Sequence, residues 1–261
     1  MPTEVLVSAV TAGLLASLAC GLGALPLAWT RLDPVHHRGI GYAVAGGLMF
    51  AASVYNLLLP GLSLGGHGWT LADVLPIIAG FLIGAAFLAL VDRHLRSRPA
   101  HKLDAVSKAW GGRVGLLVFL AMTFHSIPEG VAVGVGYTSD AVAPGDGSLG
   151  PTLALAIAIH NIPEGLAIGI PLRANGASIA RCAWAAFLTS LPQPVAAIPA
   201  VLLAWFFEPL MPLLMAFAAG AMIFLILLEL IPEALETENR RRIAWGFCIG
   251  FCFMLLMQVV L

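Results

Sequence analysis

The sequence predicts an all-α integral membrane protein with eight transmembrane helices. Of its 261 residues, 60% are hydrophobic and 10% are charged, and the mean hydropathy is +0.95. A water-exposed domain does not tolerate this balance. The apolar residues also gather in eight runs, each near the roughly 20 residues that a bilayer-spanning helix needs. Short connections leave no room for a soluble domain, so residues 1–261 are expected to form one polytopic membrane transport domain.

The first apolar run is expected to be a retained transmembrane helix. It follows MPTEV, which has no Lys or Arg, and it is too long for the core of a signal peptide. The eight expected helices cover residues 5–30, 40–60, 71–91, 114–136, 151–172, 182–206, 210–233 and 243–261.

Basic residues predict how the helices are oriented. All 13 Lys and Arg residues fall in alternate connections, between helices 1 and 2, 3 and 4, 5 and 6, and 7 and 8. The other connections are neutral or acidic. Basic loops stay in the cytoplasm, so both termini are expected outside it. The longest connection, residues 93–113, is expected to be a flexible cytoplasmic loop.

Other candidate ligands receive a simpler interpretation. His94 and His101 are scattered in the basic loop and are expected to be solvated. The four cysteines lie within or at the ends of apolar runs and are expected to be small buried residues. They are Cys20, Cys182, Cys248 and Cys252.

A repeated motif carries the chemistry. FHSIPEGVAVG occupies residues 124–134 and IHNIPEGLAIG occupies residues 159–169, each in the middle of an apolar run. Residues four apart lie on one face of a helix. His125 therefore shares a face with Glu129, and His160 shares one with Glu164. Two such pairs that face each other provide four ligands.

The electrostatics favour a divalent cation at this site. An ionisable residue at mid-membrane costs about 2.5 to 3.5 kcal/mol on insertion scales. Two glutamates carry a charge that one divalent ion cancels, while neutral imidazoles donate lone pairs. Mixed nitrogen and oxygen ligands suit zinc, iron, cobalt or manganese better than calcium or magnesium.

The surrounding residues suggest how the two motifs are arranged. Pro128 and Pro163 have no N–H to donate to the carbonyl four residues earlier, so a kink is expected in each helix. Gly130 and Gly165 permit close helix approach. The two helices run in opposite directions, as expected for copies related by a pseudo-two-fold axis in the membrane plane, with the binding site near the midplane.

These motifs resemble those of the ZIP family of zinc and iron transporters, in particular its bacterial GufA-like members, over nearly the whole chain. The resemblance implies that helices 1–3 and 6–8 are inverted repeats around a central pair, helices 4 and 5. It implies transport of divalent cations across a bacterial inner membrane toward the cytoplasm by alternating access. Zinc is the first candidate for the cargo, with cadmium, iron, manganese and cobalt as further candidates. The ion is a transported substrate, and neither a prosthetic group nor an enzymatic activity is expected.

The resemblance also implies individual ligands. The primary site comprises His125, Glu129, His160 and Glu164, with Met49 of helix 2 nearby. The weaker positions are Ser126, Asn161 and Gln193. Many relatives have a glutamate in place of Gln193, some an aspartate in place of Asn161 and some a glutamate in place of Asn56. A second ion would therefore meet fewer charges, and one tightly held ion is expected.

Several alternatives stay open. Glu229 and Glu233 either receive the departing ion or are interfacial acids that never meet metal. A membrane metallohydrolase is a rival function, although HExxH is absent, and a metal sensor without transport is another. The expected partners are divalent metal ions and the lipid bilayer, and no nucleic acid. Metal selectivity, proton coupling and oligomeric state are not determined, with a homodimer as one alternative.

Overall fold

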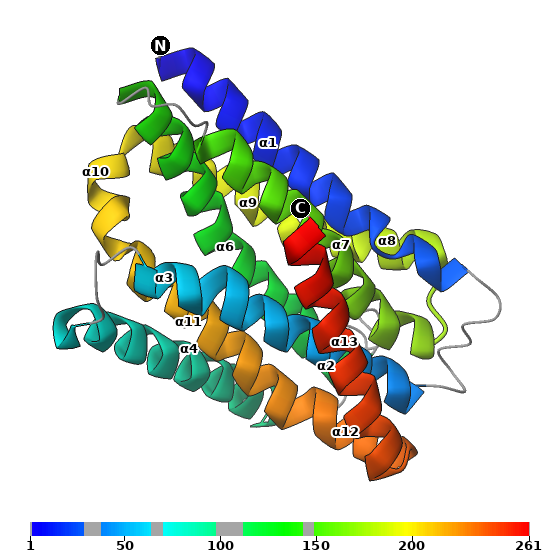
Figure 1. Ribbon diagram of the computed structural model, residues 1–261. Coiled ribbons are helices and arrows are strands. Elements are labelled where there is room, and N and C mark those ends of the chain that lie inside the picture. Colours follow the sequence, from blue (N-terminus) through cyan, green and yellow to red (C-terminus); the bar gives the residue numbers. More distant parts are fainter. Residues whose placement is uncertain (1, 29–37, 64–69, 98–111, 143–148, 261) are drawn as a thin grey trace.

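A computed structural model describes residues 2–28, 38–63, 70–97, 112–142 and 149–260 (Figure 1). This part of the chain is helical and contains no strand. The long helices are α1 (Pro2–Leu22), α2 (Arg38–Ala52), α4 (Leu71–Ser97), α6 (Gly112–Val142), α7 (Leu149–Ala174), α8 (Ile179–Ser190), α9 (Pro192–Leu202), α11 (Met211–Leu225) and α13 (Arg240–Val260). The shorter ones are α3 (Leu59–Ser63), α10 (Ala204–Phe207) and α12 (Ile231–Thr237).

The structure confirms that the chain forms long apolar helices of the predicted type. Within the described ranges, seven segments are long and apolar enough to cross a membrane. They are Thr3–Ala28, Gly39–Leu62, Leu71–Ser97, Gly115–Ala141, Leu149–Ala174, Ile179–Leu202 and Ala204–Thr237. Helix α13 packs along α2 and takes the place of the eighth predicted helix.

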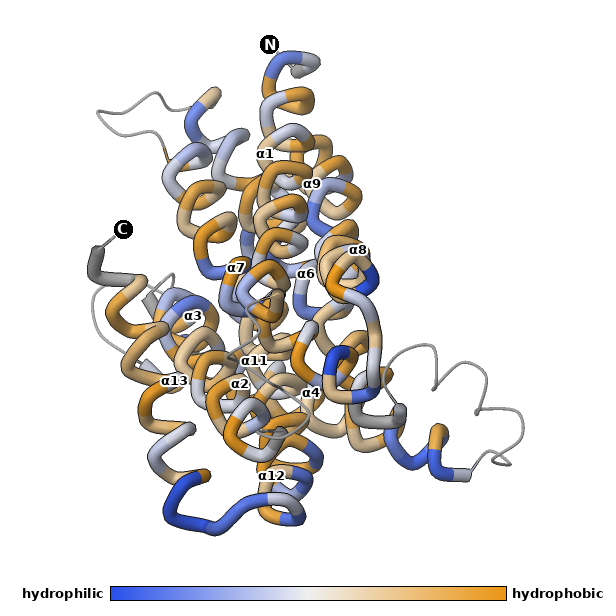
Figure 2. The backbone as a smooth tube through the Cα atoms, turned by 90° about the vertical axis from the view of Figure 1, so that its right-hand side faces the viewer, coloured by the Kyte–Doolittle hydropathy of each residue, from blue (hydrophilic) through white to orange (hydrophobic). Residues whose placement is uncertain are grey.

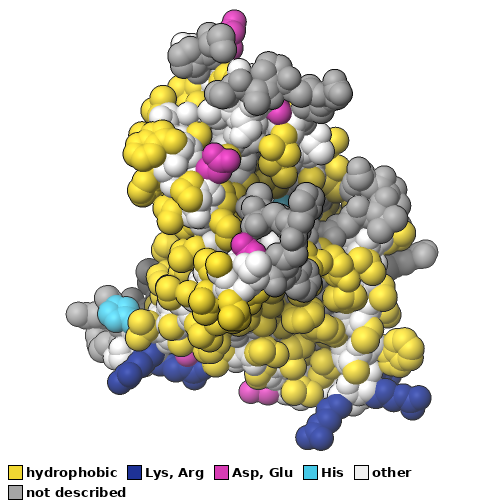
Figure 3. Space-filling model, turned by 60° about the vertical axis from the view of Figure 1, so that its left-hand side comes forward, with side chains coloured by type: hydrophobic (Ala, Val, Ile, Leu, Met, Phe, Trp, Pro, Cys, Tyr) yellow, Lys and Arg dark blue, Asp and Glu magenta, His cyan; other side chains and the backbone are white. Residues whose placement is uncertain are grey.

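The connection predicted over residues 93–113 is shorter than expected on both sides. Helix α4 continues to Ser97 and α6 begins at Gly112, while residues 98–111, including His101, lie outside the described residues. In Figure 3, the visible Lys and Arg side chains lie at one end of the molecule. This distribution agrees with the pattern from which the orientation was predicted.

The helices form two groups (Figures 1 and 2). In the first group, α1 packs on α7, and α6 on α9; in the second, α4 packs on α11, and α2 on α13. Glycines allow close approach within each group: a Cβ at Gly165 would meet the Cys20 backbone, and one at Gly84 would meet the Phe217 backbone. The groups meet where α6 contacts α11 and where α7 contacts α2.

The second and seventh crossings share a local distortion. Ser53–Leu58 and Ile226–Leu230 form π-helical turns, which lead into Pro60 of α3 and Pro232 of α12. Neither proline has an N–H for the carbonyl four residues earlier, so the ordinary helical ladder is interrupted there. The same device in these two crossings fits the predicted inverted repeats.

The sixth crossing is broken where α8 ends at Ser190 and α9 begins at Pro192. Pro194 cannot donate to the Ser190 carbonyl, and the Ser17 hydroxyl of α1 donates to that oxygen instead, at 2.7 Å. A Cβ at Gly13 would collide with the Pro194 backbone. The break is therefore held against α1, and it places Gln193 in the protein interior.

Candidate metal centre

The two motifs meet where α6 and α7 pack against each other. The four predicted ligands are buried, with exposed fractions of 2% for His125, 3% for Glu129, 6% for His160 and 3% for Glu164. One ligand atom from each residue lies within 4.8 Å of the ligand atoms of the others. The structure therefore gathers all four side chains at one point.

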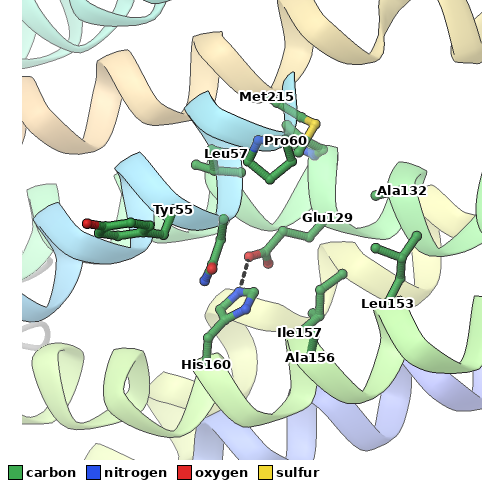
Figure 4. A pocket seen from close by; sticks show the side chains of 12 residues that line it. Tyr55, Leu57, Pro60, Glu129, Ala132, Leu153, Ala156, Ile157, His160 and Met215 are labelled. Carbon is green, nitrogen blue, oxygen red and sulfur yellow. Dashed lines mark hydrogen bonds and ion pairs between the residues drawn. The ribbon is translucent and has the colours of Figure 1, made fainter. Parts of the chain in front are cut away.

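Contacts within the cluster cross between the two motifs. The Nε2 atom of His160 lies 2.6 Å from Oε1 of Glu129 (Figure 4). The Nε2 atom of His125 lies 3.1 Å from Oε1 of Glu164 and 2.9 Å from Oε1 of Glu129. Each imidazole thus contacts the carboxylate of the other helix, and neither motif forms this cluster alone.

This arrangement suits a divalent transition-metal ion. Two ionised carboxylates in a buried site require compensation, because unpaired charge is costly away from water. One ion of charge +2 balances two glutamates, and the Nε2 atoms already point at the carboxylate oxygens. Two imidazoles with two carboxylates form a set that zinc accepts in tetrahedral geometry.

The weaker predicted positions are also buried, but their polar atoms have protein partners. The Ser126 hydroxyl donates to the Met122 carbonyl of its own helix, at 3.0 Å. The Gln193 amide nitrogen donates to Oε2 of Glu129. The Asn161 amide nitrogen donates to Oε1 of Gln193 at 3.1 Å. Whether these residues ligate metal stays a prediction.

Met49 lies in α2, is 1% exposed and belongs to the main hydrophobic core. Helix α2 contacts α7, which carries the second motif. The Ser53 hydroxyl donates to the Met49 carbonyl at 2.8 Å, immediately before the π-helical turn. A ligand role for the Met49 sulfur stays a prediction.

A cavity of about 170 Å³ reaches Glu129 and His160 (Figure 4). Its walls come from the distorted second crossing and from α6, α7 and α11, and they include Asn56, Leu153, Ala156 and Met215. Leu153 and Ala156 precede His160 on α7, so they lie on the side away from Arg173 at the opposite end of that helix. The cavity therefore extends from the site toward the end predicted to face outward.

The opposite side of the site is packed. Leu117 and Ala121 precede His125 on α6, and Ile168 and Leu172 follow Glu164 on α7. All four are buried in one hydrophobic core. They occupy the helix segments that lead toward the basic loops. The site is thus reached from the predicted outer side and covered on the predicted cytoplasmic side.

No sequence pattern points to Met215 or to the position of the cavity. Met215 lies in a continuous apolar stretch of α11, and no local pattern distinguishes it from a core methionine. Asn56 was noted only as a departure from the family pattern. Asn56 lies in the π-helical turn Ser53–Leu58. The feature of the sequence that indicates this turn is Pro60, four residues after Asn56.

Glu229 is 4% exposed and lies in the π-helical turn of the seventh crossing. One Arg96 nitrogen lies 3.3 Å from its carboxylate, and another lies 2.7 Å from Asp92. Glu233 is partly exposed. A role for either glutamate in ion release stays a prediction.

Fold and site together define a polytopic α-helical membrane protein with a buried cluster of two His and two Glu side chains that could hold a metal ion. The family described as ZIP Zinc transporter matches residues 94–258. Zinc transporter GufA of Myxococcus xanthus is 36% identical over 92% of this chain and 94% of its own length. Zinc transporter ZIPB of Bordetella bronchiseptica is 33% identical over 97% and 81%. Human zinc transporter ZIP11 is 40% identical over 56% and 43%. The chain belongs to the ZIP zinc transporter family.

Proposed function

We propose that this protein transports divalent transition-metal ions, zinc first, across a bacterial inner membrane toward the cytoplasm. The buried cluster of His125, Glu129, His160 and Glu164 carries the proposal, because its charge and ligand types match such an ion. Relatives named as zinc transporters support zinc over iron, manganese, cobalt and cadmium. The ion is the substrate, and residues 1–261 act as one transport domain.

The proposed mechanism is alternating access, and the difference between the open outer side and the packed cytoplasmic side of the site supports it. The ion enters through the cavity beside Asn56 and Met215, loses its water and binds between α6 and α7. Release requires the packed segments around Leu117 of α6 and Leu172 of α7 to separate from α11 and α2, which movement between the two helix groups would achieve. In the proposed orientation both termini lie outside. An inside-negative potential of 100 mV favours entry of a divalent ion by about 4.6 kcal/mol, at about 2.3 kcal/mol per charge.

The purified protein in sealed liposomes tests this function against its rivals. Zinc should accumulate inside, and competing cadmium, iron, manganese or cobalt should lower its rate according to affinity. Zinc binding without accumulation would indicate a sensor. Cleavage of a membrane peptide or lipid that depends on zinc would indicate a metallohydrolase, in which the ion activates water.

A further inference from the structure

Two buried amides form a pair beside the metal centre. Asn161 donates to Oε1 of Gln193 at 3.1 Å, and Gln193 donates back to Oδ1 of Asn161 at 3.4 Å. Both residues have an exposed fraction of 0%. The second N–H of Asn161 reaches the Ala16 carbonyl at 3.0 Å, and that of Gln193 reaches Oε2 of Glu129. The pair thus links α1, α7 and α9 to a candidate ligand on α6.

Chemistry fixes the direction of this chain of hydrogen bonds. A backbone carbonyl and an ionised carboxylate only accept, so an NH₂ group must stand at each end. The Asn161 nitrogen must face Ala16, which leaves its oxygen for Gln193. The Gln193 nitrogen then lies between Asn161 and Glu129, and its oxygen faces Asn161. Reversing either amide would place two donors or two acceptors against each other.

The backbone holds Gln193 in this position. Gln193 lies in the first turn of α9, next to the break after Ser190. A Cβ at Gly130 would collide with the Gln193 backbone, so the glycine after Glu129 permits the close approach. The Gln193 amide therefore belongs to a packed arrangement rather than to a freely rotating side chain.

We infer that the Gln193–Asn161 amide pair takes the place of a second cation and positions Glu129 for a single ion. The Gln193 N–H donates to Oε2 of Glu129. Oε1 of Glu129 lies 2.9 Å from Nε2 of His125 and 2.6 Å from Nε2 of His160. A second ion would need an oxygen from Gln193 in place of that N–H. The fixed direction of the pair opposes this exchange. This inference rests on the proposed function for the identity of the ion.

Zinc stoichiometry and affinity of the purified full-length protein, measured by titration calorimetry, test the inference. The wild type should bind one zinc ion. Gln193→Met keeps the length but cannot donate, so zinc should bind about 10- to 100-fold more weakly, the usual effect of losing a partner that orients a ligand. Gln193→Glu supplies a carboxylate, and the stoichiometry should rise to two. Asn175→Ala removes an amide just after the end of α7, remote from the cluster, and should change neither quantity.

Two tightly bound zinc ions in the wild type would overturn the inference, as would unchanged affinity in Gln193→Met with unchanged stoichiometry in Gln193→Glu. A generally structural role would lower thermal stability in both variants without raising the stoichiometry, which also contradicts it. If neither variant folds, the wild-type stoichiometry still decides. Failure of the proposed function would give a different result. Liposomes that contain wild-type protein would then take up no zinc, irrespective of the stoichiometry and affinity measured for the Gln193 variants.

Discussion

His160 of one motif contacts Glu129 of the other, with 2.6 Å between Nε2 and Oε1. The pair joins α7 to α6 across the pseudo-two-fold axis that the repeated motif predicts. Because Oε1 of Glu129 also lies 2.9 Å from Nε2 of His125, this single oxygen is shared by both imidazoles. The two helices therefore contribute to one site and not to two independent ones.

Removing a ligand from either motif should weaken zinc binding to a similar extent. We expect His125→Ala and His160→Ala each to raise the dissociation constant at least about 100-fold, since even partners that only orient a ligand contribute 10- to 100-fold. Titration of the purified variants measures this. His94→Ala, at an exposed position near the end of α4, is the control. Wild-type affinity in either motif variant would exclude that histidine as a ligand.

Filling the cavity should block entry without removing a ligand. Ala156 lines the cavity, and a phenyl ring there would occupy much of its 170 Å³. Ala156→Phe should strongly slow zinc uptake into liposomes, because the ring would obstruct the cavity that leads to Glu129 and His160. Leu155→Phe, on the 61% exposed neighbouring side chain, should transport normally. Equal rates in both variants would place the entry path elsewhere.

Asp140, near the end of α6, should stabilise the start of α7. Its two carboxylate oxygens accept from the backbone N–H groups of Leu149 and Gly150, at 2.9 and 2.8 Å. These groups lie at the start of α7, where helical N–H groups lack partners. Asp140→Ala should therefore lower stability by about 1 to 2 kcal/mol, measured as a lower melting temperature in detergent. Ser139→Ala is the matched control, and an equal melting temperature in both would contradict the capping role.

The orientation can be tested with cysteines in a background free of the four native ones. Thr3 of α1 and Glu236 of α12 are both exposed, and the predicted topology puts them on opposite sides of the membrane. An impermeant thiol reagent added to intact cells should label Thr3→Cys and spare Glu236→Cys until the membrane is opened. The reverse pattern would invert the proposed topology and with it the direction of entry.

Much of the fold follows from local properties of the sequence. Apolar runs and basic residues between them mark the crossings because the bilayer imposes length and charge limits on each segment separately. The buried cluster of His125, Glu129, His160 and Glu164 was predictable for the same reason, since His and Glu four apart must share a helical face. To predict that His160 and Glu164 share a face, it was enough to predict the helix that contains both residues.

What the sequence did not predict depends on contacts between distant segments. The partner of His160 is Glu129, 31 residues away, rather than a residue of its own motif. Ser17 and Ser190 meet across 173 residues, so the support for the broken sixth crossing has no local signal. Met215 reaches the cavity only because α11 packs on α6.

Zinc flux tests the central claim most directly. Wild-type protein and Glu129→Gln, which keeps the shape of the side chain but removes its charge, are placed in sealed liposomes that contain a zinc indicator. An inside-negative potential is then applied. The wild type should show saturable zinc entry that increases with the potential, and Glu129→Gln should lose nearly all of it while remaining folded. Equal entry through both proteins, or none through the wild type despite bound zinc, would contradict transport through this site.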